Sequence, residues 1–384
     1  MKVLVICNNA FNKGNGLTTV LHPTIKNLRE MGVEVRLMCT ENREPGGPQP
    51  DYPLKKFNFG PWEPIVQANG FNFAIADKKL MREAIRWADV VHLEDPMLLE
   101  MKALSIAKKE GKPCVSTFHI FPQNILWNVW KFYNSYVANY VLQKWWNLMV
   151  YNRCTDVQCP SKAVYDYLKR MHAHTRLHLI SNGTDLSGEP LDLSKEQESP
   201  RILACIGRLS KEKSPKTLLK AMKYVRNADK VQLYFAGKGM SQGKLAKKAQ
   251  KLYDDGVLKH MPVFQFCNPE QLHELRQKAY LYIHCAKIEV EGLSCLEALD
   301  DGLVPVIAKS RYVATSQFAI DERSLYKADD AKTLAERIDY WIENPEEHDR
   351  MAAEYKNLAQ QYDRKDSARQ ILEMYKQAVV GKKD

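Results

Sequence analysis

The sequence alternates short apolar runs with segments of helical periodicity, and it does so twice along the chain. Parallel strands need a long crossover connection, usually a helix, so this alternation favours parallel pairing. It therefore predicts an α/β fold built on parallel sheets. The runs that predict strands are Val3–Ile6, Val33–Met38, Val90–Leu93, Cys114–Phe118, Arg201–Gly207, Val231–Gly237, Leu281–Cys285 and Val304–Ile307. The segments that predict helices include Leu17–Met31, Leu80–Trp87, Met97–Glu110, Lys216–Val225 and Glu346–Val379.

One stretch interrupts this alternation. Residues 187–200 are acidic and contain Gly188, Pro190 and Pro200, a composition typical of a linker. A chain of 384 residues is also too long for one compact core of ordinary size. We predict an N-terminal domain over 1–186, a linker over 187–200 and a second domain over 201–360. A C-terminal helix over 361–384 has an apolar stripe that would let it pack back on the N-terminal domain.

The net charge of +10 is compatible with a nucleic acid, an anionic membrane or an anionic substrate. Residues 1–186 hold 23 Lys and Arg against 16 Asp and Glu, so most of the excess is N-terminal. No zinc finger, Arg/Gly-rich tail or aromatic RNA-binding motif accompanies the charge, and we therefore expect no nucleic-acid partner.

The nine cysteines form no Cys-x-x-Cys pair and no His-Cys cluster at metal-ligand spacing. They predict reduced, mostly buried thiols and no metal site. The sequence has no apolar stretch of eighteen residues, and Met1 leads directly into the first expected strand. We expect a cytoplasmic protein without a cleaved leader.

Three motifs follow strands of the second domain. Gly207-Arg208 with Lys213 follows the first strand, Gly237 the second, and the segment Glu289 to Glu297 lies near the end of another. Because the carboxyl ends of parallel strands share one edge, these motifs are expected at one ligand site. Taken singly, a Gly-Arg pair is more often a turn, and a Glu before a helix a cap.

Arg208 and Lys213 are cations suited to clamp a pyrophosphate. Gly292 and Leu293 precede an expected helix, so their N–H groups suit a phosphate at its positive end. Glu289 and Glu297 suit hydrogen bonds to sugar and ribose hydroxyls. With Gly237 and Glu291, these residues form the predicted donor site.

These motifs, in this order, resemble the family 4 glycosyltransferases of the GT-B fold. Glu289 and Glu297 match the family's Glu-x7-Glu motif, and Gly207-Arg208-Leu209 with Lys213 matches its phosphate clamp. Ser181 to Asp185 is similar to the segment that ends the family's first domain. The resemblance covers essentially the whole chain. It implies two Rossmann-like domains facing a central cleft.

The resemblance also implies roles. Arg208 and Lys213 would bind the donor pyrophosphate, Glu297 the ribose and Glu289 the transferred sugar. Gly16 would approach the phosphates, although the family often has Gly-Gly where this chain has Asn15-Gly16. His119 corresponds to the active-site histidine, which with Glu289 forms the predicted catalytic pair. The family retains anomeric configuration and needs no tightly bound metal, so Mg²⁺ is expected to be accessory at most.

The stretch from Gly111 to Thr155 contains no acidic residue. Its helical apolar stripe favours either a helix in the headgroup region of an anionic bilayer or a core helix of the first domain. The basic excess of this domain favours the membrane. Family members carry the acceptor site there, and Phe118 to Ile125 is similar to a segment of bacterial lipid-glycosylating members. The predicted acceptor and membrane residues are Trp127, Trp130, Lys131, Lys144 and Trp145.

The predicted function is therefore transfer of a hexose from a nucleotide sugar to a membrane lipid such as diacylglycerol, at the cytoplasmic membrane face. UDP-glucose is the favoured donor, with GDP-mannose next. The alternatives are a soluble or polysaccharide acceptor, a GT-B enzyme such as a UDP-sugar epimerase, and a nonenzymatic nucleotide-sugar-binding module. The sequence leaves the oligomeric state open.

Overall fold

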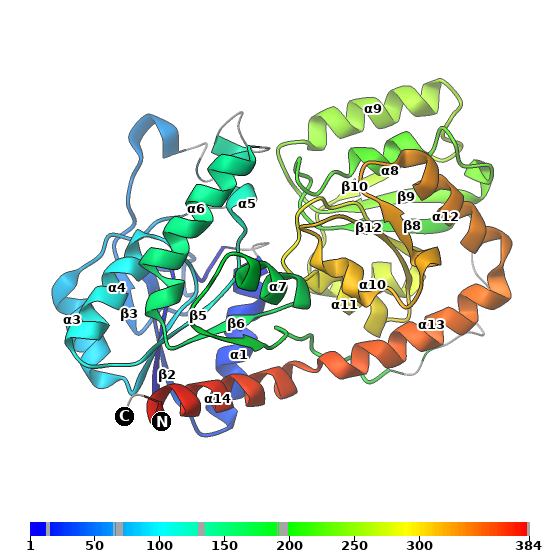
Figure 1. The fold of residues 1–384 in the computed structure, drawn as a ribbon. Coiled ribbons are helices and arrows are strands. Elements are labelled where there is room, and N and C mark those ends of the chain that lie inside the picture. The colour runs from blue at the N-terminus through cyan, green and yellow to red at the C-terminus, as the bar shows by residue number, and fades with distance from the viewer. Residues whose placement is uncertain are drawn as a thin grey trace. The chain divides into compact units, whose positions relative to one another are not determined.

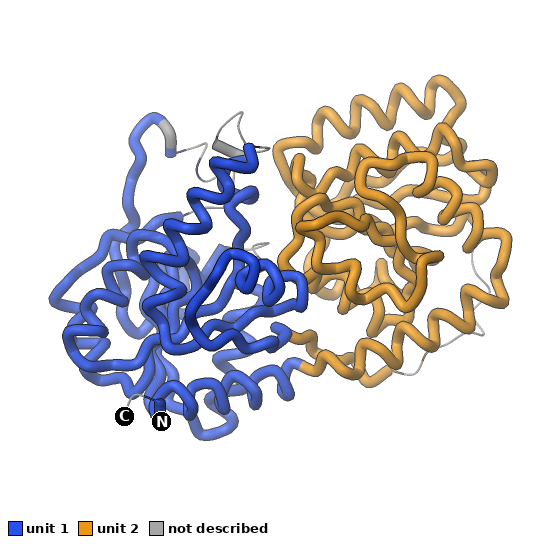
Figure 2. The backbone as a smooth tube through the Cα atoms, in the orientation of Figure 1, with its two compact units in different colours: residues 1–182, 364–384 blue, residues 183–363 orange. Residues whose placement is uncertain are grey.

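The computed structural model describes residues 1–12, 16–63, 66, 72–129, 135–189, 191 and 199–381. The chain divides into two compact units (Figure 2). Unit 1 comprises residues 1–182 and 364–384, and unit 2 residues 183–363. Each unit contains one parallel sheet with helices, so the predicted α/β class with two Rossmann-like domains is confirmed (Figure 1).

The sheet of unit 1 has seven strands in the order β3-β2-β1-β4-β5-β6-β7, all paired in parallel. Its inner strands are almost wholly buried, which explains why they show no alternation of apolar and polar residues. The strands are β1 (Lys2–Ile6), β2 (Glu34–Thr40), β3 (Tyr52–Leu54), β4 (Val90–Leu93), β5 (Cys114–Thr117), β6 (Asp156–Cys159) and β7 (Arg176–Leu179).

The helices of unit 1 include the last helix of the chain. Helix α14 packs against α1, and Ile371, Met374 and Tyr375 are buried in one core with residues of β1 and β2. The helices are α1 (Gly16–Glu30), α3 (Lys78–Trp87), α4 (Leu98–Lys109), α5 (Pro122–Val129), α6 (Tyr136–Met149), α7 (Lys162–Arg170) and α14 (Arg364–Val380).

Unit 2 repeats this architecture with a six-stranded parallel sheet in the order β10-β9-β8-β11-β12-β13. The strands are β8 (Arg201–Ile206), β9 (Val231–Ala236), β10 (Val263–Gln265), β11 (Ala279–His284), β12 (Val304–Lys309) and β13 (Leu325–Lys327). The helices are α8 (Lys216–Ala221), α9 (Gln242–Asp254), α10 (Pro269–Lys278), α11 (Leu293–Asp300), α12 (Ala331–Glu343) and α13 (Pro345–Ala359).

Each sheet reverses its strand order once. In unit 1 the chain first builds outward from β1 to β2 and β3, and then places β4 on the other side of β1. In unit 2 the same reversal lies between β8 and β11. Such a switch point leaves a crevice at the carboxyl ends of the two strands, where open α/β sheets bind ligands.

The chain passes between the units at two places, between Asn182 and Gly183 and between Asp363 and Arg364. These passages run side by side in unit 2, where the N–H of Thr184 donates to the carbonyl of Tyr362 at 2.8 Å. The expected helical stretch from Glu346 to Val379 is accordingly broken at residues 360–362, where a short 3₁₀ turn separates α13 from α14.

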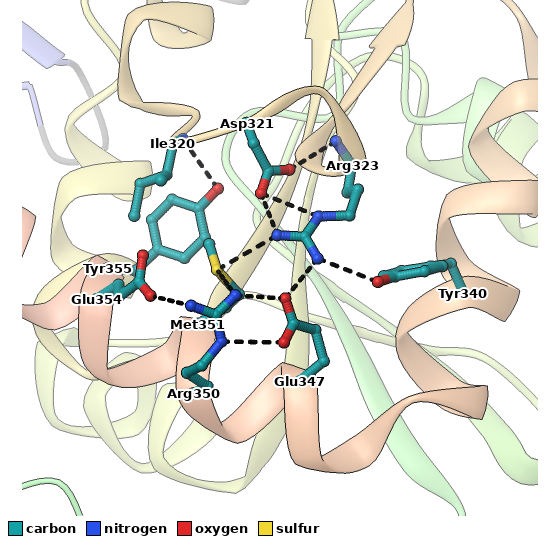
Figure 3. A network of polar contacts seen from close by, with 9 residues as sticks. All are labelled: Ile320, Asp321, Arg323, Tyr340, Glu347, Arg350, Met351, Glu354 and Tyr355. Atoms are coloured by element: carbon teal, nitrogen blue, oxygen red, sulfur yellow. Dashed lines mark hydrogen bonds and ion pairs between the residues drawn. The ribbon is translucent and has the colours of Figure 1, made fainter.

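An ion-pair network holds α13 against the rest of unit 2 (Figure 3). The guanidinium of Arg323 donates to Asp321 at 2.9 Å, to the Tyr340 hydroxyl at 3.1 Å and to Glu347 on α13. Arg350 donates to the other oxygen of Glu347 at 3.0 Å. Because α13 packs against α11, this network also supports the helix that follows the Glu289 motif.

We expect Arg323→Gln to lower the melting temperature by a few degrees, because three partners lose their donor together. Hydrogen bonds from Arg350 and Arg323 lower the pKa of Glu347 to about 2. Stabilisation by this depressed pKa is present at neutral pH and is lost as the pH falls from about 4.5 to about 2. Thermal unfolding followed by circular dichroism should therefore show that the difference in melting temperature between Arg323→Gln and the wild type becomes smaller over that pH interval. Arg369→Gln removes a solvent-exposed pair with Asp366 and is the control, for which little change is expected.

Candidate active site

The loop after β8 carries the predicted phosphate clamp. Arg208 lies 3.3 Å from the buried carboxylate of Glu212, measured from Nη2 to Oε1, and its side chain remains 45% exposed. Ser210 donates to the same Glu212 oxygen at 2.6 Å. The guanidinium is thus oriented by a buried carboxylate but still reaches solvent, where an anion can meet it.

The loops after β8 and β9 touch backbone to backbone. Gly237 has a φ of +155°, and a Cβ there would lie 2.0 Å from the carbonyl oxygen of Gly207. A Cβ at Gly239 would lie 2.4 Å from the carbonyl oxygen of Leu209. No other residue fits this approach, so the two glycines set the shape of the clamp loop.

Lys213 and Glu289 form an ion pair beside the switch point of unit 2. The ring Nε2 of His284, at the end of β11, lies 3.4 Å from the same Glu289 oxygen. Burial opposes ionisation of Glu289, but the charge of Lys213 and the His284 hydrogen bond outweigh it and hold the pKa well below its ordinary value. Burial lowers the pKa of His284, which keeps the imidazole neutral. The site therefore holds one carboxylate and one ammonium that stabilise each other.

Helix α11 begins one residue after Gly292, earlier than the sequence predicted, so Leu293 lies in its first turn. Gly292 has a φ of +106°, and a Cβ there would lie 2.3 Å from Oγ1 of Thr315. That hydroxyl donates to the carbonyl of Glu291 at 3.1 Å. Glu297, one turn along α11, is bound by Arg276 at 3.2 Å.

One small cavity brings part of the predicted donor site together. Of the predicted residues, Arg208, Lys213 and Glu289 line it, and Gly237, Glu291, Gly292, Leu293 and Glu297 do not. His284 and Ser294 also line it and were missed. The available indication for His284 was a polar residue near the carboxyl end of the apolar run Leu281–Cys285.

His119 in unit 1 lies two residues beyond β5. Its Nε2 is 2.7 Å from Oε2 of Glu94, which follows β4 directly. Glu94 is buried, and burial opposes its ionisation, but the neighbouring imidazoles, first His92 and then the hydrogen-bonded His119, hold its pKa below the ordinary value. Burial raises the pKa of the adjacent Asp95 to about 6. Sequence reasoning found His119 but missed both acids, although two carboxylates directly after an apolar strand could have indicated them.

The remaining predictions for unit 1 concern Gly16 and the aromatic stretch. Gly16 is the first residue of α1 and is exposed. Trp130 and Lys131 lie outside the described residues, and Trp127 belongs to α5, with its side chain likewise outside the description. Lys144 and Trp145 both lie on α6.

Helix α6 has an inverted distribution of polarity. Its buried side includes three amides at four-residue spacing, Asn139, Gln143 and Asn147. Trp146 is buried with them, but an apolar face is exposed. We call the following residues the apolar face of α6: Tyr136, Val137, Tyr140, Val141, Trp145 and Leu148, which are between 40% and 67% exposed.

Lys144 lies at the border of this apolar face. Its ammonium donates to the carbonyl of Met171 at 3.0 Å and lies 5.6 Å from the centre of the Tyr140 ring. The amide side chains of α6 face the interior of unit 1, where Asn147 also donates a hydrogen bond to the Met171 carbonyl at 3.0 Å. The stripe that could have been a core face is therefore turned to solvent.

Two Rossmann-like domains with candidate ligand groups at both switch points define the GT-B class of glycosyltransferases. Two family matches divide the chain in the same way. The family described as Glycosyltransferase Family 4 matches residues 14–187, and that described as Glycosyl transferases group 1 matches residues 192–358. The chain belongs to the family 4 glycosyltransferases.

The chain is also similar to characterised proteins. Alpha-monoglucosyldiacylglycerol synthase of Acholeplasma laidlawii is 24% identical over 263 residues, which span 64% of this chain and 65% of that protein. The structure of Anabaena Alr3699/HepE in complex with UDP and glucose is 17% identical, with a TM-score of 0.72 over 97% of this chain and 99% of the other. That likeness establishes the fold.

A further solved chain is more similar in sequence but over a shorter range. The catalytic domain of cholesterol-alpha-glucosyltransferase from Helicobacter pylori is 41% identical, covering 43% of this chain and 99% of the other with a TM-score of 0.40. Because its TM-score is low, this match supports no statement about the fold.

Within the described residues, no helix is both long and apolar enough to cross a bilayer. The same residues include no group of three or more His, Cys, Asp or Glu side chains arranged to hold a metal ion. All nine cysteines are buried, as the sequence predicted, and none forms a disulfide.

We expect Gly237→Ala to weaken binding of UDP by at least about tenfold, because the new methyl forces the β8 loop away from the β9 loop. Isothermal titration calorimetry with UDP measures the affinity, and thermal unfolding measures the accompanying loss of stability. The matched control is Gly243→Ala on α9, where a Cβ meets nothing within 4 Å. Alanine is the better helix former, so this control should bind UDP normally and be at least as stable as wild type. Equal UDP affinity of the two variants would contradict the assignment of the clamp loop.

Proposed function

We propose that the chain is a retaining hexosyltransferase that moves glucose from UDP-glucose to a hydroxyl of a membrane lipid such as diacylglycerol. The observation that carries this proposal is the exposed apolar face of α6 in the unit that holds His119. The enzyme would act while bound peripherally to the cytoplasmic membrane face.

The donor half of the proposal rests on unit 2. Arg208 and Lys213 supply the positive charge that would stabilise a leaving diphosphate, and the N-terminal N–H groups of α11 would add to it. Glu289 is ionised and half-buried, so it would accept hydrogen bonds from hydroxyls of the transferred sugar. Gly237, Glu291, Gly292, Leu293 and Glu297 are proposed to shape and complete the nucleotide site.

Retention would follow from reaction on a single face of the sugar. The acceptor oxygen forms a bond to the anomeric carbon as the bond to the diphosphate breaks. The leaving phosphate oxygen takes the acceptor's proton, and His119 polarises the sugar. We propose no tightly bound cofactor, with Mg²⁺ accessory at most.

The choice of UDP-glucose is supported by the names of similar proteins. The HepE structure holds UDP and glucose, and the Acholeplasma relative is named for a glucosyl lipid. GDP-mannose is the second candidate donor.

The lipid acceptor is supported by the chemistry of α6. Soluble helices turn their apolar stripe inward, whereas α6 places amides inward and aromatic and aliphatic side chains outward. The surrounding sequence from Gly111 to Thr155 is free of acids, so an anionic surface meets no opposing charge from it. We propose that the apolar face of α6, with Lys144 at its border, lies in the lipid headgroup region. Trp127, Trp130 and Lys131 are proposed to extend this surface.

The donor site is tested by Arg208→Ala and Glu289→Gln. Arg208→Ala should weaken UDP affinity about tenfold or more, because one charge-assisted contact to the diphosphate is lost. Glu289→Gln should lower kcat about a hundredfold while UDP affinity stays within about threefold, because the sugar loses its partner and the phosphates do not. Transfer of radiolabelled glucose into extracted lipid, with and without EDTA, measures turnover. The control is Arg226→Ala, which removes a surface pair with Glu343. Wild-type turnover in Glu289→Gln would contradict the proposed role.

Membrane binding is tested by Val141→Asp, which puts a charge on the apolar face of α6 where the valine is 58% exposed. We expect binding to vesicles of phosphatidylcholine with phosphatidylglycerol to fall at least about tenfold, because a charged side chain must leave water on insertion. Vesicle flotation at low salt measures it. The matched control is Val380→Asp on α14, where the valine is 64% exposed.

The class of acceptor is identified by measuring glucose transfer in the same vesicles when they also contain diacylglycerol or a sterol. Equal flotation of the Val141 and Val380 variants, or transfer to a soluble sugar acceptor alone, would contradict the lipid proposal.

A further inference from the structure

A hydrogen bond joins the last helix of the chain to β4 inside unit 1. The hydroxyl of Tyr375, on α14, lies 2.7 Å from Nδ1 of His92 in β4, although 283 residues separate them. Both side chains are buried, with exposed fractions of 1% and 4%. A buried polar pair of this kind is stable only if every member is satisfied.

The hydrogen bonds around His92 determine which atom is the donor in each of them. Nε2 of Gln158 donates to the carbonyl of Ile180 at 3.1 Å, so its Oε1 is the acceptor for the hydroxyl of Thr117 at 2.9 Å. Since Thr117 has given its only proton to Gln158, its oxygen must accept from Nε2 of His92 at 2.8 Å. Burial lowers the pKa of His92, so the ring is neutral and carries its proton on Nε2. Its Nδ1 is then an acceptor, and Tyr375 donates to it.

His92 also lies close to the carboxylate that binds His119. Nδ1 of His92 is 3.6 Å from Oε1 of Glu94, too far for a hydrogen bond, while the other oxygen of Glu94 accepts from His119 at 2.7 Å. Because Nδ1 carries no proton, it cannot donate a hydrogen bond that would draw Glu94 toward it. The Tyr375 hydroxyl thus occupies the one atom of His92 that could compete with His119 for Glu94.

We propose that Tyr375 is a positioning residue for the reaction, which keeps His92 from drawing Glu94 away from His119. The last helix of the chain then has a part in setting the active-site histidine. The role rests on the proposed function, since it assigns Tyr375 an effect through His119 rather than a contact with substrate.

Removal of the hydroxyl has a defined consequence. In Tyr375→Phe, Nδ1 of His92 is left buried without a donor, a costly state that is relieved when Nδ1 takes up a proton from solvent. Nε2 keeps its own proton for Thr117, so the ring becomes an imidazolium, and the negative charge of Glu94 offsets the cost of burying it. A protonated Nδ1 donates to Oε1 of Glu94, and the carboxylate is then shared between two imidazoles. His119 loses its orientation, whereas the donor groups of unit 2 are untouched.

We expect Tyr375→Phe to lower kcat about tenfold with KM for UDP-glucose unchanged within about twofold, a split typical of a displaced catalytic group. The double variant His92→Leu/Tyr375→Phe removes the competing imidazole, and Thr117 keeps its bond to Gln158. It should recover most of the lost kcat, because no second imidazole then competes with His119 for Glu94 and the two contacting positions are coupled. The control is Tyr280→Phe in unit 2, which removes a buried hydroxyl that donates to the Trp341 carbonyl at 2.7 Å and should leave kcat unchanged.

A second measurement is independent of turnover. Nitrogen-15 NMR of the histidine side chains should show Nδ1 of His92 unprotonated in the wild-type chain and protonated in Tyr375→Phe. The inference is overturned if the nitrogen spectrum is the same in both proteins, or if the double variant is no faster than Tyr375→Phe. If the wild-type chain transfers no sugar, the proposed function fails, and the NMR comparison still decides whether Tyr375 sets the state of His92.

Discussion

The parallel pairing of β1 with β4 and of β8 with β11 is the constraint on which both candidate sites depend. Each pair lies where its sheet reverses strand order, so the connections leave in opposite directions and the carboxyl ends stay open. The residues that follow these strands are held by a rigid sheet but are not covered by a crossover helix. Glu94 after β4 and Arg208 after β8 are both placed in this way. The same reversal of strand order therefore places a polar site in each unit.

Charge in these sites is arranged in pairs, because an isolated buried charge is too costly to keep. Glu289 is compensated by Lys213, and Glu94 by His119. The two pairs differ in what they offer a ligand. Lys213 belongs to a cationic loop suited to phosphate, whereas Glu94 lies beside Asp95 in a site rich in acceptors of hydrogen bonds. This difference supports the proposal that unit 2 binds the donor and unit 1 the acceptor.

Helix α6 shows how the same composition can serve a core or a surface. Its apolar residues recur at helical spacing, which requires that they share a face but does not say which way the face points. The structure decides this through the amides: Asn147 donates to the Met171 carbonyl, which turns the opposite side outward. A soluble fold gains nothing by exposing Tyr136 and Leu148 together, so the arrangement is expected to serve a contact with something apolar.

The sequence by itself determined the α/β class, most strands and the motif residues of unit 2, because strand and helix periodicity and the Gly-Arg and Glu-x7-Glu spacings are local properties of the chain. It could not locate the unit boundary at residues 182 and 363, since that boundary depends on which segments pack together. Nor could it find Glu94 as the partner of His119, or Tyr375 as the partner of His92. Those pairs join residues 25 and 283 positions apart, and only the register of β4 beside β5 and the packing of α14 bring them within hydrogen-bonding distance. Tertiary structure decided these contacts because hydrogen bonds between distant residues are set by the fold and leave no periodic trace in the chain.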